Sequence, residues 1–196
     1  AVQVLEFVEA RAQGLDHGGR HGEGLFAQVA AGRGELDVGL ARPPFDTDLL
    51  DSQVVLREPL MAVVPTGHRL ARLGRPLVPS DLDGEGVIGY HPQQSRYFHE
   101  LLVRFFGASQ PRVDQRVHQV LTAMLLVSAG RGIALAPASA GSLGVAGVEL
   151  VGLDHGGGDD RVDADPERPV ELYAVWRRRT VSPVVRRVLR VVGAMS

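Results

Sequence analysis

The chain has 196 residues and a mass of 21.0 kDa, which corresponds to one large or two small domains. Apolar residues make up 44% and charged residues 22% of the chain, so a sizeable buried core is available and wholesale disorder is disfavoured. Twenty-one basic and 23 acidic residues give a net charge of −2. This balance disfavours direct DNA binding by the segment, because such binding normally shows as a basic domain or stripe.

Cysteine is absent, which excludes disulfides, thiolate metal sites and thiol nucleophiles. No apolar run reaches the roughly 18 residues of a membrane span. The N-terminus also lacks the ordered basic, apolar and small-residue regions of an export signal. We therefore expect a cytoplasmic protein with no membrane partner.

Regular elements alternate along the first third of the chain. Residues 24–32 predict a helix that ends at a glycine, and residues 36–41 predict a strand closed by Arg42 and two prolines. Residues 54–65 contain two apolar runs divided by Glu58 and a proline. Because proline is not accommodated inside a central strand, we expect one strand that leaves a sheet and a second that enters another.

The alternation continues to the C-terminus. We expect strands over residues 87–90, 133–137 and 170–176, and helices over residues 97–106, 121–129 and from Pro183 onward, the last with Ser182 as its N-cap. Gly130 suits the left-handed position that ends a helix. Residues 154–169, rich in glycine, aspartate and proline, predict a polar loop.

This succession predicts an α/β fold with a mostly parallel sheet. Two features indicate two lobes. The strand pair divided by a proline near residue 59 would carry the chain out to a second lobe, and the late strand after the polar loop would carry it back. Ligands of open α/β sheets bind beyond the carboxyl ends of the strands. In this sequence those ends are Arg42, the loop 91–96 and the region near Pro137.

Nucleophilic catalysis finds little support in the sequence. There is no G-x-S-x-G elbow, and Ser139 and Ser142 lie in a small-residue turn after a strand. Two clusters have metal-ligand residue types. HGGRHGEG over 17–24 is too rich in glycine to stay helical, and the aspartates of 159–165 lack EF-hand spacing, so solvated loops are the favoured interpretation of both.

The remaining candidates are suited to holding a small anion. The guanidinium of Arg42 can pair bidentately with a carboxylate, and a salt bridge at the surface or between lobes is an equally weighted alternative. The loop HPQQS delivers the start of an aromatic-faced helix, where unpaired amides and the helix dipole favour negative charge. Phe98 is a candidate apolar wall of the ligand pocket, although core packing accounts for most of the aromatic stripe of Tyr97 and Phe98. Ser95, Gln119 and Thr122 are candidate donors or, equally, helix caps.

The segments GELDVGLARPP, LREPLMAVVPTGHRLA, VIGYHPQQSRYF and LVSAGRGIALAPAS together resemble the effector-binding domain of LysR-type transcriptional regulators. The resemblance covers about residues 24–196 and is greatest to the branch that senses muconate, benzoate and related products of aromatic degradation. It implies two Rossmann-like lobes joined by two crossover strands, a fold like that of type 2 periplasmic solute-binding proteins. Residues 1–58 and 168–196 would form lobe I, and residues 59–167 would form lobe II.

In that family the effector lies between the lobes, so the resemblance implies ligand contacts at particular positions of this chain. These are Arg42, Arg96, Tyr97, Phe98, Gln119, Val120 and Val170, to which the anion-binding helix start adds Gln94 and Ser95. Glu23 or Gly24 stands where the family usually has a hydroxyl residue, and a carboxylate there would repel a dicarboxylate ligand. Residues 1–14 look like the family's first helix without the strand that precedes it.

We therefore expect a ligand-sensing regulatory domain that binds a small aromatic or dicarboxylic acid and has no enzymatic activity, no cofactor and no metal. DNA binding would belong to a winged helix-turn-helix domain that this chain lacks, and self-association would give a homodimer or homotetramer. A periplasmic solute-binding protein of a transporter is the first alternative. An enzyme on the same scaffold, such as a deaminase or dehydratase, is the second, but it would need a catalytic acid or nucleophile converging on the cleft.

Overall fold

The structure is a computed structural model that describes residues 37–107, 109, 111–154, 167–178 and 183–193. The chain divides into two compact units, one made of Ala1–Arg57 with Glu171–Ser196 and the other of Glu58–Val170. We call them unit 1 and unit 2. The helices expected at 1–14 and 24–32, Glu23, the metal-ligand clusters of 17–24 and 159–165, and Ser182 all lie outside the described residues.

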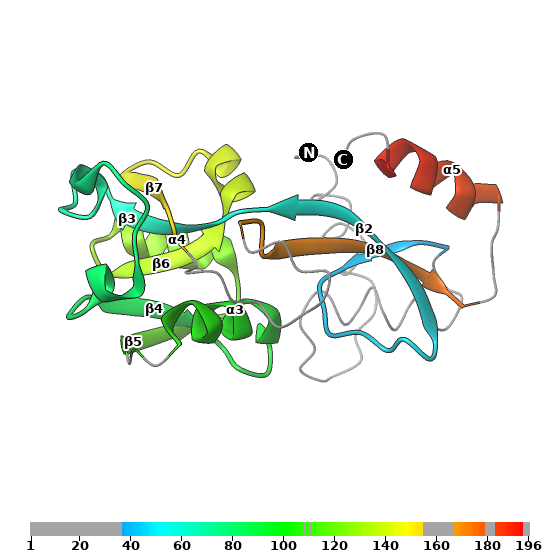
Figure 1. The fold of residues 1–196 in the computed structure, drawn as a ribbon, viewed down its shortest axis with the longest axis horizontal. Helices are drawn as coiled ribbons and strands as arrows, with labels where there is room; N and C mark the ends of the chain where they lie inside the picture. The colour runs from blue at the N-terminus through cyan, green and yellow to red at the C-terminus, as the bar shows by residue number, and fades with distance from the viewer. Residues whose placement is uncertain (1–36, 108, 110, 155–166, 179–182, 194–196) are drawn as a thin grey trace. The chain divides into compact units, whose positions relative to one another are not determined.

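Unit 2 is built on a five-stranded sheet with the strand order β5-β4-β6-β3-β7 (Figure 1). Its strands are β3 (Leu60–Pro65), β4 (Gly86–Tyr90), β5 (Arg112–Val117), β6 (Ile133–Pro137) and β7 (Val148–Gly152). Strand β4 is parallel to β5 and β6, whereas β3 is antiparallel to β6 and β7. Only β3 therefore runs against the other four strands, so the expectation of a mostly parallel sheet is confirmed for unit 2, with one antiparallel strand between β6 and β7. Strand β3 enters directly from the preceding strand, so no crossover constrains it to be parallel, whereas residues 138–147 cross β3 to reach β7, which runs parallel to β6.

Helices cover both faces of this sheet. Helix α3 (Arg96–Phe106) packs on one face and α4 (Val120–Ser128) on the other (Figure 1). Successive strand side chains point to opposite faces. Accordingly Leu60, Ala62 and Val64 of β3 join the cluster under α3, while Val63 joins the cluster under α4. The central strands are buried from both sides, which explains their nearly continuous apolar sequences.

Unit 1 has a three-stranded sheet with the order β1-β8-β2. The strands are β1 (Gly39–Ala41), β2 (Leu50–Glu58) and β8 (Val170–Arg177), and helix α5 (Pro183–Gly193) follows them. Ala41, Leu50 and Val175 form a small core under the rings of Phe45 and Tyr173, which meet edge to face with centroids 5.2 Å apart. Strands β2 and β8 carry the chain between the units, so the two-lobed α/β fold with two crossover strands is confirmed.

Most predicted elements are present, with shifted ends. Strand β2 begins at Leu50 instead of Val54, and β1 is shorter than predicted. Gly130 has a φ of 70°, which confirms the left-handed position after α4. The sequence did not predict β5, β7 or the 3-10 helices η2 (Ala71–Leu73), η3 (Pro79–Leu82) and η4 (Ala138–Leu143). Within the described part of the chain, no helix is long and apolar enough to cross a membrane.

Candidate functional site

The starts of α3 and α4 lie next to each other in unit 2. Strands β4 and β5 are parallel neighbours, and each is followed by one of these helices, so both helices begin beyond the same edge of the sheet. Two hydrogen bonds join the loops that precede them. The backbone N–H of His91 donates to the carbonyl of Val117 over 2.9 Å, and the hydroxyl of Ser95 donates to the carbonyl of His118. The two helix starts therefore form one connected rim.

The rim is suited to an anion because no side chain caps either helix, as far as the described residues show. Ser95 and Gln119 occupy the N-cap positions, but neither makes a side-chain capping hydrogen bond. The alternative interpretation of both residues as caps is therefore wrong. The positive ends of two helix dipoles lie at one edge, where negative charge is stabilised by about 0.3–1 kcal/mol per helix at an exposed site.

Two histidines that the sequence did not single out hold this rim in shape. The Nδ1 atom of His91 accepts the backbone N–H groups of Gln93 and Gln94, each at 3.3 Å. The imidazole of His118 lies beside it with ring centroids 5.1 Å apart. Gln94 is thereby placed in a turn directly before α3, and it is half-buried. The sequence marks His91 and His118 only by their position, because each histidine directly follows a strand and precedes the start of a helix.

Aromatic rings line the first turn of α3. The ring of Phe98 lies 5.2 Å from that of Tyr90 and 5.5 Å from that of Tyr97. Phe98 packs against the clusters on both faces of the sheet and remains half-buried, so core packing and a ligand wall are compatible roles. The Tyr97 hydroxyl donates to the carbonyl of Pro169 over 3.2 Å, which ties α3 to the segment that precedes β8.

Other predicted site residues have different surroundings. Arg96 is exposed and forms an ion pair along the helix surface with Glu100, with Nε and Oε1 2.6 Å apart. Val120 is half-buried at the start of α4. Val170 is fully buried in the core cluster under α3. The structure thus brings residues 94–98 and 119–120 to one rim and places Val170 in the adjoining core.

Arg42 belongs to unit 1. Its Nη1 donates to the backbone carbonyl of Glu171 over 2.9 Å, at the start of β8. The buried carboxylate of Glu171 accepts from Nε of Arg57 at 3.0 Å and from the Tyr173 hydroxyl at 2.9 Å. Arg42 is therefore anchored beside a network that joins the two crossover strands.

Ser139, a serine that could have been a nucleophile, instead connects η4 to the end of β2. Its backbone N–H and its hydroxyl donate to the buried carboxylate of Glu58 at 2.6 and 3.1 Å. These bonds hold the start of η4 to the end of β2. Among the described residues, no group of three or more histidine, aspartate or glutamate side chains is placed to hold a metal ion.

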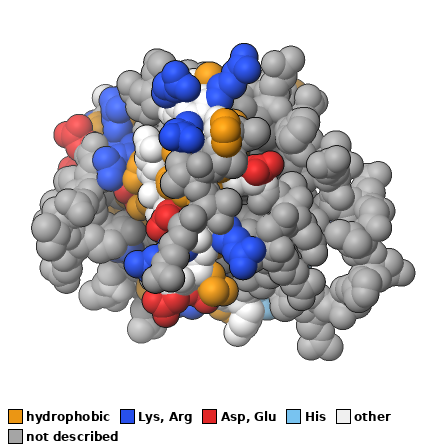
Figure 2. All heavy atoms as spheres, turned by 90° about the vertical axis from the view of Figure 1, so that its right-hand side faces the viewer, with side chains coloured by type: hydrophobic (Ala, Val, Ile, Leu, Met, Phe, Trp, Pro, Cys, Tyr) orange, Lys and Arg blue, Asp and Glu red, His pale blue; other side chains and the backbone are white. Residues whose placement is uncertain are grey.

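The exposed surface of unit 1 carries positive charge along α5. Arg186, Arg187 and Arg190 are exposed on this helix, and its first turn has no acidic residue. Figure 2 shows basic side chains gathered on the face that looks toward the viewer. Every basic residue of the chain is an arginine.

Comparison with known proteins gives the family. Residues 23–195 match the family described as LysR substrate binding domain. The HTH-type transcriptional regulator CatR of Pseudomonas putida is 31% identical over 165 residues, which are 83% of this chain and 53% of CatR. The Hca operon transcriptional activator HcaR of Escherichia coli (strain K12) is 28% identical over 162 residues, which are 82% of this chain and 51% of HcaR. The chain thus spans about half the length of these relatives.

Solved structures show the same fold. Full-length BenM aligns with a TM-score of 0.69 and 23% identity over 86% of this chain and 53% of BenM. The BenM effector binding domain with its effector benzoate aligns with a TM-score of 0.65 and 20% identity, over 98% of this chain and 86% of that one. The effector binding domain of QuiR in complex with shikimate gives a TM-score of 0.66 and 14% identity over 97% and 87%. The family match extends over most of the sequence, and the chain therefore belongs to the LysR substrate-binding domain family.

Proposed function

We propose that this chain is the ligand-sensing domain of a LysR-type transcription regulator and that it binds a small aromatic or dicarboxylic acid. The observation that carries the proposal is the rim at the start of α3 and α4, where two uncapped helix N-termini are joined by hydrogen bonds. The BenM effector binding domain is known with its effector benzoate and that of QuiR with shikimate, and both are small carboxylic acids, which supports this ligand class.

The proposed role of the rim follows from its chemistry. A ligand carboxylate accepts hydrogen bonds from first-turn amides of α3 and α4, and such charge-assisted bonds are roughly twice as strong as neutral ones. The ring of Phe98, held by Tyr90 and Tyr97, offers an apolar face to the body of the acid. Gln94 and Gln119 lie at the two helix starts as neutral donors, which select for a small acid without adding charge.

The regulatory role rests on the relatives. CatR and HcaR are named as transcriptional regulators, and each is about twice as long as the segment that this chain matches. We propose that the acid binds one conformation of the domain more tightly than another and that a separate DNA-binding domain responds. The difference in affinity sets how far the equilibrium moves. A homodimer or homotetramer is the proposed assembly.

Isothermal titration of the chain with benzoate, cis,cis-muconate and shikimate tests ligand binding. We expect at least one acid to bind, and Phe98→Ala to weaken its binding about tenfold, because the substitution removes the apolar wall. Leu125→Ala, which truncates an exposed side chain of α4 beyond its first turn, is the matched control and should change the affinity less than twofold.

Arg42 is tested in the same way. Arg42→Ala should weaken binding about tenfold if its guanidinium contacts the acid, whereas Arg177→Ala, an exposed arginine of the same unit, should not. Failure of all three acids to bind the wild-type chain would refute the acid-sensing proposal. Unchanged binding by Arg42→Ala would remove Arg42 from it.

A further inference from the structure

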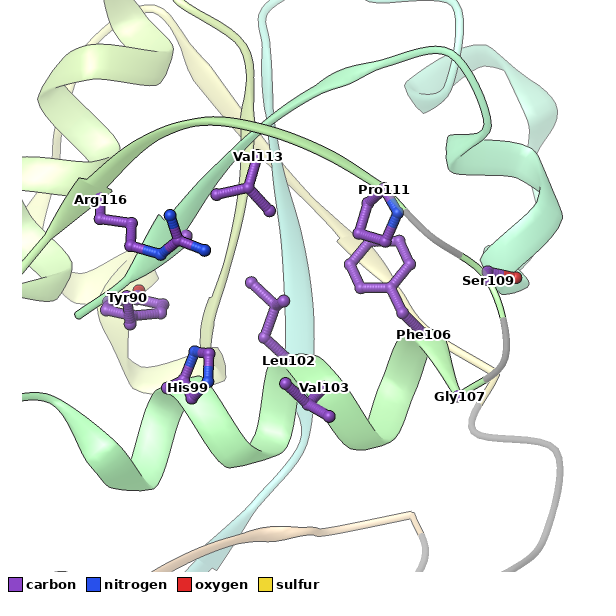
Figure 3. Close-up of a pocket in the computed structure, with 11 residues that line it drawn as sticks. Tyr90, His99, Leu102, Val103, Phe106, Gly107, Ser109, Pro111, Val113 and Arg116 are labelled. Carbon is purple, nitrogen blue, oxygen red and sulfur yellow. The ribbon is translucent and has the colours of Figure 1, made fainter. Parts of the chain in front are cut away.

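We propose that unit 2 has a second small-molecule site, between α3 and the edge strand β5, and that it takes a one-ring carboxylic acid. A pocket of about 260 Å³ lies there, separate from the rim described above. Figure 3 shows Arg116, His99 and Tyr90 at one end of this pocket, and Phe106 and Pro111 at the other. The pocket is thus cationic at one end and apolar at the other.

An irregularity in strand pairing places Arg116 on the wall of this pocket. Val87 of β4 is opposite Val113, but the register then shifts, so that Gly89 is opposite Arg116. Opposed residues share a face of the sheet, and alternate residues of β4 share one too. Val113 and Arg116 therefore face α3 together, whereas regular alternation would have put Gln115 there. Bulges commonly re-aim a side chain in this way beside functional sites.

Gly89 leaves the space that the pocket occupies beside Arg116. A Cβ atom placed on Gly89 would lie 2.9 Å from Cγ1 of Val113, closer than side chains approach. Any larger residue at this position would displace Val113, which also lines the pocket. The missing side chain on β4 and the re-aimed arginine on β5 are separate features of two strands, and both shape the same space.

Helix α3 supplies the opposite wall through a stripe at helical spacing. His99, Leu102, Val103 and Phe106 recur at intervals of three and four residues, so they share the face that looks toward β5 (Figure 3). Leu102 and Phe106 are buried, but Val103 is 52% exposed. An exposed valine at the edge of an apolar pocket gives a ligand ring a surface to cover.

Two side chains with nitrogen donors, those of Arg116 and His99, line this pocket. Among the residues that the structure describes, the Arg116 guanidinium and the His99 imidazole form no ion pair or side-chain hydrogen bond. The lining contains no carboxylate, and the acid nearest along β5, Asp114, is paired with Arg112 at 3.1 Å. A ligand carboxylate would therefore meet a positive group that no residue of the described ranges neutralises.

The volume limits the ligand. Pockets for drug-sized molecules have about 300–1,000 Å³, and this one is smaller. One six-membered ring with a carboxylate fits such a space, whereas a nucleotide does not. Because Arg116 is exposed, its contact with the acid is screened by water, and we expect millimolar affinity.

Methyl-resolved NMR titration of the chain tests this site directly. Benzoate and cyclohexanecarboxylate are the two acids, and benzamide is the neutral control of the same shape. We expect saturable shifts of the Val103 and Val113 methyl groups with both acids, and weaker binding of benzamide. Arg116→Gln should lower the benzoate affinity of this pocket about fivefold, while Arg131→Gln, an exposed arginine outside it, should change it less than twofold. Circular dichroism confirms that each variant is folded.

The titration also separates this site from the proposed sensing site. The Val120 methyl groups report on the rim, and Val103 and Val113 report on the pocket between α3 and β5. Shifts at Val120 with none at Val103 and Val113 would overturn the second site and leave the proposed function standing. Equal affinity of the pocket for benzoate in the wild type and in Arg116→Gln would also overturn it. Shifts confined to Val103 and Val113 would support the second site alone.

Discussion

Two glycines that flank Arg131 should differ sharply in what they tolerate. Gly130 has a φ of 70° and open space around the position of a Cβ atom. Gly132 has a φ of 139°, and a Cβ atom there would lie 2.4 Å from the carbonyl oxygen of Gly86. Both belong to the segment that precedes β6 and that carried the family resemblance. We expect Gly130→Ala to be mild and Gly132→Ala to be severe.

The magnitudes follow from the geometry. Alanine in the left-handed region costs about 1 kcal/mol, so Gly130→Ala should lower Tm by about 3 °C at the roughly 2–4 °C per kcal/mol of a chain this size. At Gly132 the φ lies beyond that region, and carbon and oxygen normally approach no closer than about 3.3 Å. The start of β4 must then move by roughly 1 Å. Strain and overpacking together cost about 4 kcal/mol, or roughly 10 °C.

Thermal unfolding followed by circular dichroism measures both variants. If Gly132→Ala lowers Tm no more than Gly130→Ala does, the close approach of residue 132 to the backbone of β4 is refuted. A soluble, folded Gly132→Ala protein with unchanged Tm would refute the strain argument as well.

Three further predictions concern buried or paired carboxylates. Glu58→Gln should lower the free energy of unfolding by about 2 kcal/mol in urea titration, because the amide cannot accept both hydrogen bonds from Ser139; an unchanged midpoint would contradict this. Glu171→Gln should cost about 1–2 kcal/mol in the same assay, since the bond from the Arg57 guanidinium loses its charge partner, and a stabilised variant would contradict it. The hydrogen bond from the Arg75 guanidinium, and then the one from the Val78 amide, lower the pKa of Asp81 to about 2. The ionised Asp81 carboxylate therefore stabilises the folded state by about 1 kcal/mol above pH 4, and this stabilisation is lost as the pH falls toward 2. Asp81→Asn should flatten the pH dependence of stability in that window, and an unaltered slope would exclude the pair as its cause.

The sequence predicted the elements whose apolar residues face a core. Strand β6 and helix α3 were found because their burial is continuous or periodic. Strand β5, with the sequence RVDQRV, was missed because it is an edge strand with four exposed residues. Strand β7 was missed because each of its five residues is only half-buried, so no apolar run marks it.

The site was predictable where local position determines it. Phe98 and Ser95 follow from a loop that opens an aromatic helix, although the Ser95 hydroxyl bonds to His118 instead of capping. The roles of His91 and His118 arise from contact between two loops, which no local pattern encodes. The bond from Arg42 to Glu171 spans 129 residues of sequence and depends on the pairing of β1 with β8.

The outer edge of β5 bears on how this domain avoids aggregation. An edge strand presents unpaired backbone groups to which a strand of another chain can add. On β5 the charged side chains of Arg112, Asp114 and Arg116 and the shifted register oppose such addition, because a straight incoming strand would meet both charge and a bend. Both features disfavour the joining of copies of the domain into a continuous sheet along this edge.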